Sequence, residues 1–308
     1  MGVKNLMTII EKYSPNSIKI KTFNNYHKKT LGIDCNLMIY KIVLGVRSSG
    51  YDLKNDGIIV THIHGMIQKL LSFKKNNIKA IFVFDGIPSD LKMETLENRK
   101  KQWDLLKLKY KNAKSDDEKK KYYYHKSDIT TLEIMEVIEI IKIFGYPIIE
   151  SDIEADITLA ELSKQNKIDY IVTDDLDILV FGGKNILKGF SISDKKKFQE
   201  ISLKQFLKDS GLIQQKLIDI AILIGCDYCP KTKKIGPITA YKLVRENGNI
   251  EFPKNYNTVK KFFMSSDKNI NNFKYKENNI DINKLIIFLK NYKFKQKYID
   301  TLITNITK

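Results

Sequence analysis

The stretch KAIFVFDG, residues 79–86, is a continuous apolar run that ends in an aspartate and a glycine. Strands buried on both faces of a parallel sheet lose the alternation of apolar and polar residues, so this run predicts such a strand. Four other short runs predict further strands: KTLGIDC (29–35), GYPIIES (145–151), DYIVTDD (169–175) and NILKGFS (185–191). The chain is therefore expected to build a central sheet.

Segments with helical periodicity lie between these runs, at residues 36–47, 60–78 and 154–166. A strand–helix–strand order places parallel strands side by side and helices on their faces. We therefore predict an α/β fold with a central, mainly parallel sheet flanked by helices. Residues 128–145 predict a further amphipathic helix, with Asp128 as its N-cap.

Residues 90–126 differ from the rest, because they are highly charged and contain neither glycine nor proline. One interpretation is a long solvated helix with a flexible tip. The other is a mobile basic arm over a polyanion. Trp103, Tyr110 and the run 122–124 interleave aromatic rings with lysines, as stacking on single strands requires.

From about residue 202 onward the pattern predicts mostly helices, at 203–211, at 214–225 and after a turn near residue 236. Two weaker helices are expected near 283–292 and 296–303. We therefore divide the chain into a main domain, residues 1–250, and a C-terminal helical tail, residues 251–308, that packs on the core.

The 308 residues include 53 Lys and Arg against 36 Asp and Glu, which gives a formal net charge of +17. This charge favours nucleic acid, an anionic membrane or an acidic protein as a partner. Because Lys, Ile and Asn are all abundant, part of the excess reflects the bias of an AT-rich genome. The apolar share of 43% excludes a wholly disordered chain.

No run reaches the roughly 18 apolar residues of a membrane span, and the N-terminus lacks a signal-peptide pattern. We therefore expect an intracellular protein that is not secreted. Three cysteines, Cys35, Cys226 and Cys229, indicate a reducing compartment. Cys226 and Cys229 have the spacing of a redox or zinc half-site, but no second half-site exists, so ordinary buried cysteines are favoured.

Acidic residues follow successive predicted strands and helices. They are Asp34, Asp85, Glu154, Asp156, Asp175, Asp177 and Asp227. A single aspartate after a strand is usually a turn residue or a cap, and we interpret Asp152 and Asp174 in that way. Glu150 and Asp152 are not expected to be direct metal ligands. Seven at one sheet edge would repel one another unless some are protonated or divalent cations neutralise them. Oxygen ligands select Mg²⁺ or Mn²⁺, and two such ions would support phosphodiester hydrolysis.

These motifs resemble the flap endonuclease branch of the structure-specific 5′ nucleases, nearly in register over residues 1–250. MGVKNL, IDCNLMIY, VFDGIP, IEAD, TDDLD and LIGCDYC are similar to that family's blocks, in the same order. The resemblance implies a PIN-like 5′ nuclease fold, with residues 90–126 as a helical arch and about 202–250 as a helix-hairpin-helix region. It also implies two Mg²⁺ ions, replaceable by Mn²⁺, on the seven carboxylates named above.

Further roles come from the resemblance by position. Tyr40 would stack on the base next to the cut phosphate, and Lys92 and Arg99 would steer that phosphate from one side of the helix after VFDGIP. Gly2 would approach the active site once Met1 is removed. The other expected DNA contacts are Arg47, Lys233, Lys234, Gly236 and Lys242.

The sequence also departs from the family pattern. Asp156 stands where the family usually has Glu. Lys234-Ile235-Gly236-Pro237-Ile238 lacks the first glycine and the following basic residue of G-(I/V)-G-P-(K/R), which argues against the family's K⁺ site. The C-terminal TLITNITK contains no sliding-clamp peptide, so recruitment by that route is not expected.

The expected function is a 5′ flap endonuclease with 5′→3′ exonuclease activity on DNA junctions, in replication, repair or recombination. A monomer is expected at the site of DNA replication, which is the nucleus if the protein is cellular and a cytoplasmic replication site if it is viral. The alternatives are a mainly exonucleolytic relative, a junction-cleaving enzyme, a catalytically silent DNA-binding scaffold and an RNA 5′ exonuclease.

Overall fold

The computed structural model describes residues 2–3, 5–123, 129–265 and 270–307. The chain divides into two compact units, each built from separated segments. The first comprises Met1–Asp34, Val83–Leu96 and Ile149–Lys274, and the second comprises Cys35–Phe82, Glu97–Ile148 and Tyr275–Lys308. The predicted boundary at residue 250 does not separate these units, because the tail contributes to both.

The sheet contains seven strands in the described part of the chain, in the order β1-β9-β8-β7-β2-β5-β6. Their bounds are β1 (Ile18–Lys21), β2 (Thr30–Asp34), β5 (Lys79–Phe84), β6 (Ile148–Glu150), β7 (Tyr170–Val172), β8 (Asn185–Lys188) and β9 (Phe198–Ser202). Strands β2, β7 and β8 run parallel, as predicted, and pair Ile33 with Val172 and Ile171 with Ile186. Strand β9 is antiparallel to both β8 and β1.

The apolar runs form the core of the sheet because they are covered on both faces. Leu31, Ile33, Ile171 and Ile186 are fully buried. A side chain at Gly32 would overlap Leu159 of helix α7 (Ala155–Lys164), so the glycine lets this helix lie close to β2. The sheet edge that carries the ends of β2 and β7 is thereby held by tight packing.

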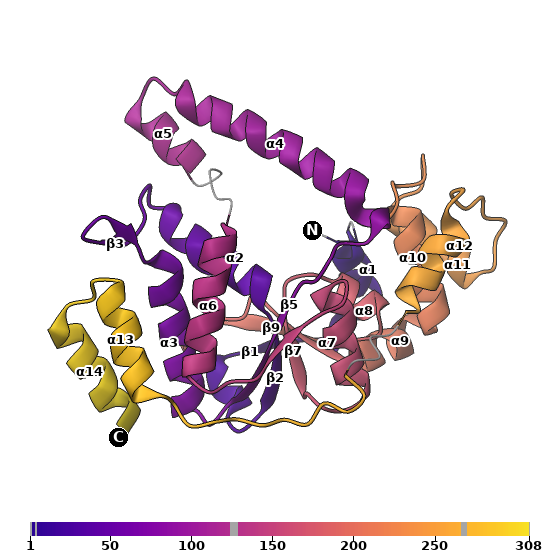
Figure 1. The fold of residues 1–308 in the computed structure, drawn as a ribbon. Helices are drawn as coiled ribbons and strands as arrows, with labels where there is room; N and C mark the ends of the chain where they lie inside the picture. Colours follow the sequence, from indigo (N-terminus) through magenta and orange to yellow (C-terminus); the bar gives the residue numbers. More distant parts are fainter. Residues whose placement is uncertain (1, 4, 124–128, 266–269, 308) are drawn as a thin grey trace. The chain divides into compact units, whose positions relative to one another are not determined.

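The first unit also contains the helices α1 (Leu6–Tyr13), α8 (Asp177–Val180), α9 (Leu203–Ser210), α10 (Gln214–Ile224), α11 (Pro237–Arg245) and α12 (Tyr256–Phe263). Figure 1 shows α10, α11 and α12 grouped together. From Leu217 onward helix α10 is apolar and buried except for Asp219, which accepts hydrogen bonds of 2.8 Å from Tyr256 and Lys260 of α12. Because its charge is paired in this way, Asp219 can lie within the apolar helix without a large cost.

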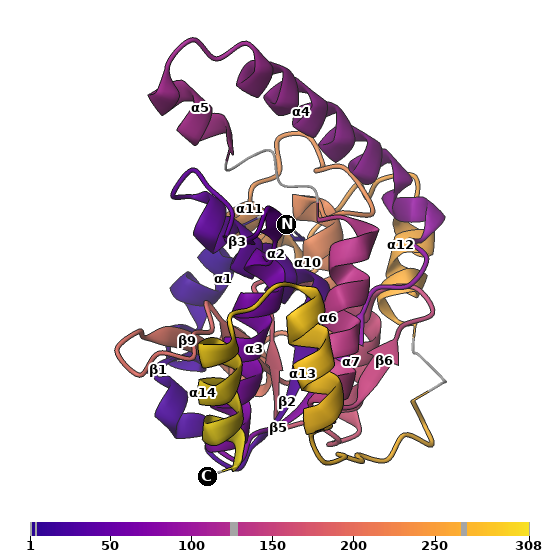
Figure 2. The same cartoon turned by 60° about the vertical axis from the view of Figure 1, so that its left-hand side comes forward.

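The second unit is mainly helical and includes α2 (Cys35–Arg47), α3 (Thr61–Lys75), α5 (Asp116–Tyr123), α6 (Thr131–Ile143), α13 (Ile282–Asn291) and α14 (Gln296–Thr307). It also has the small hairpin β3 (Lys54–Asn55) and β4 (Ile58–Ile59). Helix α3 packs between α2 and α6, and α13 lies against α6 and α14 (Figure 2). Helix α4 (Met93–Lys111) runs from the first unit into the second.

Several local predictions were refined by the structure. Helix α6 begins after Thr130, whose hydroxyl accepts the Glu133 N–H while the Glu133 carboxylate accepts the Thr130 N–H, a capping box. Asp128, the predicted cap, and Tyr124 lie outside the described residues. Within the described part of the charged segment 90–126, α4 (Met93–Lys111) and α5 (Asp116–Tyr123) form two helices instead of a single long one. None of the described helices combines the length and apolarity needed to cross a bilayer.

Candidate active site

The seven predicted carboxylates all belong to the first unit. Asp34 ends β2, Asp85 follows β5, Glu154 and Asp156 begin α7, Asp175 and Asp177 follow β7, and Asp227 follows α10. Their positions agree with the prediction that separate strands and helices each contribute an acid near the carboxyl edge of the sheet.

Hydrogen bonds join the ends of β2 and β7. Thr173 Oγ1 donates to Asp34 Oδ2 at 3.0 Å and accepts the Asp175 N–H at 3.1 Å. The Asp177 N–H in turn donates to Asp175 Oδ1 at 3.0 Å. Because these are neighbouring parallel strands, one hydroxyl can orient the acids of both. Thr173 was not among the predicted site residues, although it stands within the TDDLD motif.

The N-terminal segment touches these acids. The Val3 N–H donates to Asp177 Oδ1. Gly2 has a φ of +75°, and a Cβ there would overlap the carboxylates of Asp175 and Asp177. Glycine is therefore needed at this position, both for its backbone conformation and for the close approach. The approach of Gly2 to the acids agrees with the expectation from the sequence, whereas Met1 lies outside the described residues.

A lysine and a tyrosine complete the cluster. Lys92 Nζ lies 2.6 Å from Glu154 Oε2 and 3.9 Å from Asp227 Oδ2. The Tyr228 hydroxyl donates to the same Glu154 oxygen at 2.8 Å. Burial would lower the pKa of Lys92, but Glu154, Asp156 and Asp227 outweigh that effect and raise the pKa. The Lys92 ammonium therefore stays charged and partly neutralises the acids.

Asp85 connects β5 to α7. Its carboxylate accepts the N–H of Ala155 at 2.9 Å, one of the unsatisfied donors at the start of that helix. A Cβ on the adjacent Gly86 would overlap the backbone carbonyls of Ser151 and Asp152. The glycine after Asp85 thus allows the loops that follow β5 and β6 to approach closely, which sets where Asp85 lies.

The pKa values of three acids are raised in the folded chain. Burial raises the pKa of Asp156 and Asp177 well above the usual aspartate range. Neighbouring carboxylates raise both values further, with Asp175 the strongest neighbour in each case. The pKa of Asp175 itself is also raised, first by burial and then by Asp227. Ionised together, these acids would repel one another in a poorly solvated site.

The oxygen donors of the seven acidic side chains are suited to a hard divalent cation. As they stand, no three His, Cys, Asp or Glu side chains among the described residues are arranged to hold a metal ion. All seven acids nevertheless offer the oxygen donors that Mg²⁺ and Mn²⁺ prefer. Glu154 Oε1 is buried without a hydrogen-bond partner, and a cation would satisfy it and relieve the repulsion between acids.

The remaining predicted residues lie at varied positions. Tyr40 is half-buried on α2, and Arg99 is half-buried on α4. Lys92 ends a 3₁₀ turn, Asp90–Lys92, and so precedes α4. Lys92 therefore precedes by one residue the α-helix that carries Arg99, and the 3₁₀ turn leads directly into that helix at Met93.

The predicted helix-hairpin-helix region, about residues 202–250, contains α9, α10 and α11 with the loops between them. Gly236 is the N-cap of α11, and a Cβ there would meet open space. Lys233, Lys234 and Lys242 are exposed. Lys234 has a φ of 63°, the left-handed conformation that glycine adopts most easily. The backbone thus has a glycine-like conformation at the position where the family pattern has its first glycine.

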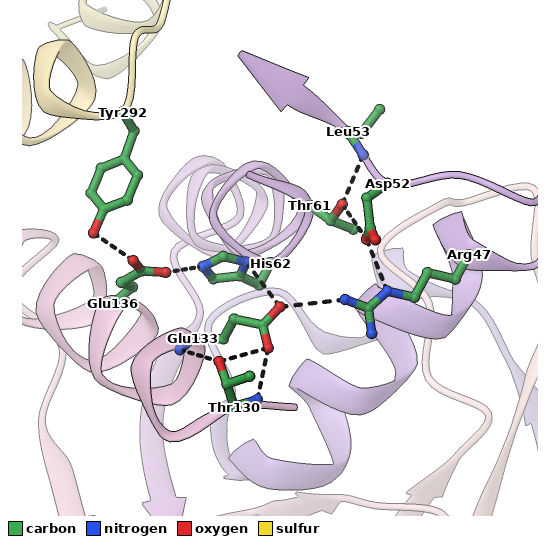
Figure 3. A network of polar contacts seen from close by, with 9 residues as sticks. All are labelled: Arg47, Asp52, Leu53, Thr61, His62, Thr130, Glu133, Glu136 and Tyr292. Atoms are coloured by element: carbon green, nitrogen blue, oxygen red, sulfur yellow. Dashed lines mark hydrogen bonds and ion pairs between the residues drawn. The ribbon is translucent and has the colours of Figure 1, made fainter. Parts of the chain in front are cut away.

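Arg47 has a different environment from that of a DNA contact. Its side chain is buried, with Nε 2.9 Å from Asp52 Oδ1 and Nη2 3.5 Å from Glu133 Oε1 (Figure 3). Thr61 Oγ1 donates to the same Asp52 oxygen at 3.0 Å and accepts the Leu53 N–H at 2.9 Å. These pairings favour a structural role for Arg47 within the second unit over the predicted contact with DNA.

The same network continues across α3, α6 and α13. His62 Nε2 contacts Glu136 Oε2, and Nδ1 lies 3.8 Å from Glu133 Oε1. The Tyr292 hydroxyl, at the C-terminal end of α13, donates to the other Glu136 oxygen at 2.7 Å. Figure 3 shows these side chains converging between the helices. Sequence reasoning missed this polar core, because its members come from three stretches far apart in the chain: residues 47–62, 130–136 and 292.

Glu133→Ala is expected to destabilise the protein by about 2 kcal/mol, since Arg47 and the start of α6 each lose a buried charged hydrogen-bond partner. The variant keeps the ion pair between Arg47 and Asp52 but removes the carboxylate that accepts the Thr130 N–H. Urea unfolding would measure the loss. Glu139→Ala, on the exposed face of the same helix, is the matched control and should change stability by less than about 0.5 kcal/mol. Equal losses would contradict the network's role.

Two family models match this chain, and the two matched regions together contain all seven acids. Residues 1–104 match the family model of the XPG N-terminal domain, and residues 145–227 match that of the XPG I-region. Asp34 and Asp85 fall in the first region, and the other five acids fall in the second.

Relatives along most of the chain are flap endonucleases. The chain is 30% identical to Flap endonuclease 1 of Entamoeba dispar over 284 residues, which cover 90% of this chain and 74% of that protein. It is 32% identical to Flap endonuclease 1 of Xiphophorus maculatus over 257 residues, covering 82% and 68%.

Two solved structures share the fold. Flap endonuclease-1 from Methanococcus jannaschii has a TM-score of 0.75 and 26% identity, and the match covers 94% of this chain and 95% of that one. The catalytic core of Rad2 in complex with DNA substrate has a TM-score of 0.75 and 22% identity, covering 97% and 99%. Since every acid of the cluster lies within the matched regions, the chain belongs to the flap endonuclease family.

Proposed function

We propose that the chain is a structure-specific 5′ flap endonuclease that hydrolyses DNA phosphodiesters near junctions of single and double strands. The observation that carries this proposal is the set of seven carboxylates at the ends of strands and helices within the regions matched to the family. The enzyme is a hydrolase of DNA, and its high positive charge suits that polyanionic substrate. A 5′→3′ exonuclease activity at the same site belongs to the proposal.

Two divalent cations, Mg²⁺ or Mn²⁺, are proposed as cofactors held by the seven carboxylates. The support is the donor chemistry, the unsatisfied Glu154 Oε1 and the raised pKa values of three acids. When bound, such ions would lower the pKa of a water molecule and stabilise charge on the phosphate oxygens. The protein orients their ligands through Thr173, Val3 and Tyr228, whose hydrogen bonds hold three different carboxylates.

Lys92 is proposed to bind the scissile phosphate next to the acids. Its ammonium is charged and already lies against Glu154 and Asp227, so it can be shared between these carboxylates and an incoming phosphate oxygen. Arg99 is proposed to bind the same phosphate, and Tyr40 to stack on the adjacent base. Support for these two roles comes from the family resemblance and from their partial exposure.

Duplex DNA is proposed to contact the loop before α11. Gly236 caps that helix with an open approach to its first N–H groups, and exposed Lys233, Lys234 and Lys242 supply positive charge nearby. Backbone donors at a helix start suit a phosphate, and lysines add a salt-dependent attraction. We further propose that the protein acts as a monomer, inside the cell, where DNA is replicated or repaired.

The metal-free protein is expected to melt at a lower temperature as the pH rises from about 5 to 8. The pKa values of Asp156, Asp175 and Asp177 are raised in the fold, so the folded chain binds more protons than the unfolded chain above about pH 4. Stability is therefore lost as the pH rises through the raised values. Calorimetry in EDTA would measure the melting temperature at each pH. Added Mg²⁺ should raise that temperature most at the higher pH.

Asp177→Asn removes one buried charge, so this variant should show a smaller fall in melting temperature over the same range. Asp174→Asn should keep the wild-type slope, because Asp174 is not one of the three repelling acids and its carboxylate accepts the Gly189 N–H. A melting temperature that rises with pH in EDTA would contradict the assignment of repelling acids.

The proposed function is tested by cleavage of labelled DNA substrates: a 5′ flap, a double flap, a nick, a gap, a bubble and a four-way junction, each with Mg²⁺ and with EDTA. Incision at the base of the 5′ flap that requires Mg²⁺ is expected. Preference for the four-way junction or for stepwise removal of nucleotides would favour the junction-cleaving or exonucleolytic alternatives. Binding without cleavage would favour the DNA-binding scaffold.

A further inference from the structure

Two cysteines, Cys226 and Cys229, flank the site residues that follow α10. Cys226 and Cys229 stand on either side of Asp227 and Tyr228 and pair as an isolated antiparallel bridge. The Cys226 N–H donates to the Cys229 carbonyl at 3.1 Å, and the two sulfur atoms lie 3.4 Å apart. Both residues are free thiols and are buried, with exposed fractions of 7% and 5%.

This geometry is close to that of a disulfide. Residues opposite each other in an antiparallel pair have Cα atoms roughly 4.5–5.5 Å apart, which falls within the range that disulfides span. A disulfide bond is about 2.05 Å long, so the sulfur atoms need to approach by about 1.4 Å. Backbone pairing already holds the two residues together, so closure requires a local adjustment of a four-residue turn.

We propose that Cys226 and Cys229 are a reversible oxidation site, at which a disulfide switches off the nuclease by displacing Asp227 and Tyr228. The oxidant is a hydroperoxide, here hydrogen peroxide. One sulfur attacks a peroxide oxygen, the O–O bond breaks, and a sulfenic acid and water form. The second sulfur then displaces the hydroxyl group as a second water, and the two thiol hydrogens leave in these waters. Dithiol reductants reverse the step.

The loss of activity follows from what the two central residues hold. Tyr228 donates to Glu154, Asp227 lies near Lys92, and the Asp227 carbonyl accepts the Thr95 hydroxyl hydrogen at 2.7 Å. Cys229 also donates to the Ile222 carbonyl of α10, at 3.6 Å, a bond that a disulfide removes. Displacement of reacting groups by about 1 Å can lower a rate roughly 100-fold, so closure should affect chemistry more than DNA binding.

The test treats the purified full-length protein with hydrogen peroxide, blocks remaining thiols, and analyses the tryptic peptide that contains both cysteines, Leu217–Lys231. We expect this peptide to lack two hydrogens and to resist the blocking reagent. The single-turnover rate on a 5′-flap substrate should fall roughly 100-fold and return with dithiothreitol. Circular dichroism of each sample shows whether the fold is retained.

Matched variants separate the site from other oxidation. Cys226→Ser and Cys229→Ser should each keep their rate after peroxide, whereas Cys35→Ser should respond like the wild type. The inference is overturned if no disulfide forms, if it forms without slowing cleavage, or if both serine variants lose activity as the wild type does. It rests on the proposed nuclease function. If the reduced protein cleaves no substrate, that function fails, while the peptide still reports whether the disulfide forms.

Discussion

Asp177→Asn is expected to lower the single-turnover rate of flap cleavage in Mg²⁺ by roughly 1000-fold. Asp177 is buried, accepts the Val3 N–H and has a raised pKa. Its negative charge therefore destabilises the fold unless a bound cation neutralises it. Asparagine keeps the shape and an acceptor oxygen for Val3 but loses the charge. DNA affinity should change little, because a carboxylate does not attract a polyanion.

The rate should be measured with enzyme in excess over a labelled 5′-flap substrate, and affinity should be measured in Ca²⁺ or EDTA. Asp174→Asn is the matched control. That residue lies in the same TDDLD segment, but its carboxylate accepts the Gly189 N–H at 2.6 Å. The control should cleave at nearly the wild-type rate. Cleavage by Asp177→Asn at such a rate would remove Asp177 from the proposed metal ligands.

The positions of the acids along the chain could be predicted because each depends on a local pattern. An apolar run such as 79–86 predicts its own strand, and Asp85 then follows at the edge where parallel strands end. The resemblance added Lys92, which lies outside any strand pattern, and the structure places it against Glu154. Local sequence therefore indicated most of the candidate site.

Features that depend on distant segments could not be predicted in the same way. Among the described residues, β1 pairs with β9 and β9 pairs with β8, and the short, partly polar sequences of β1 and β9 give little strand signal. The burial of Arg47 involves Glu133, 86 positions away, and the predicted DNA contact could not take this distant partner into account. The Cys226–Cys229 pair has a visible spacing, but only the turn between them shows that the sulfur atoms face each other.

Lys92→Ala is expected to slow single-turnover cleavage roughly 100-fold while leaving the dissociation constant for the flap substrate nearly unchanged. One positive charge among many adds little to the binding of an extended polyanion. The same charge beside Glu154 and Asp227 matters when the phosphate gains charge in the transition state. Lys92→Arg should recover part of the rate, since the charge returns with a different shape.

Lys119→Ala is the control for a diffuse basic surface, because that lysine is exposed on α5, in the predicted arch. It should weaken binding or threading of the flap and leave the rate of bound substrate nearly unchanged. Rates and dissociation constants for the three variants, measured at two salt concentrations, distinguish the roles. If Lys92→Ala and Lys119→Ala lose affinity equally and keep equal rates, Lys92 contributes only to general attraction. A rate loss confined to Lys92→Ala would instead show that its ammonium acts on the phosphate being cleaved.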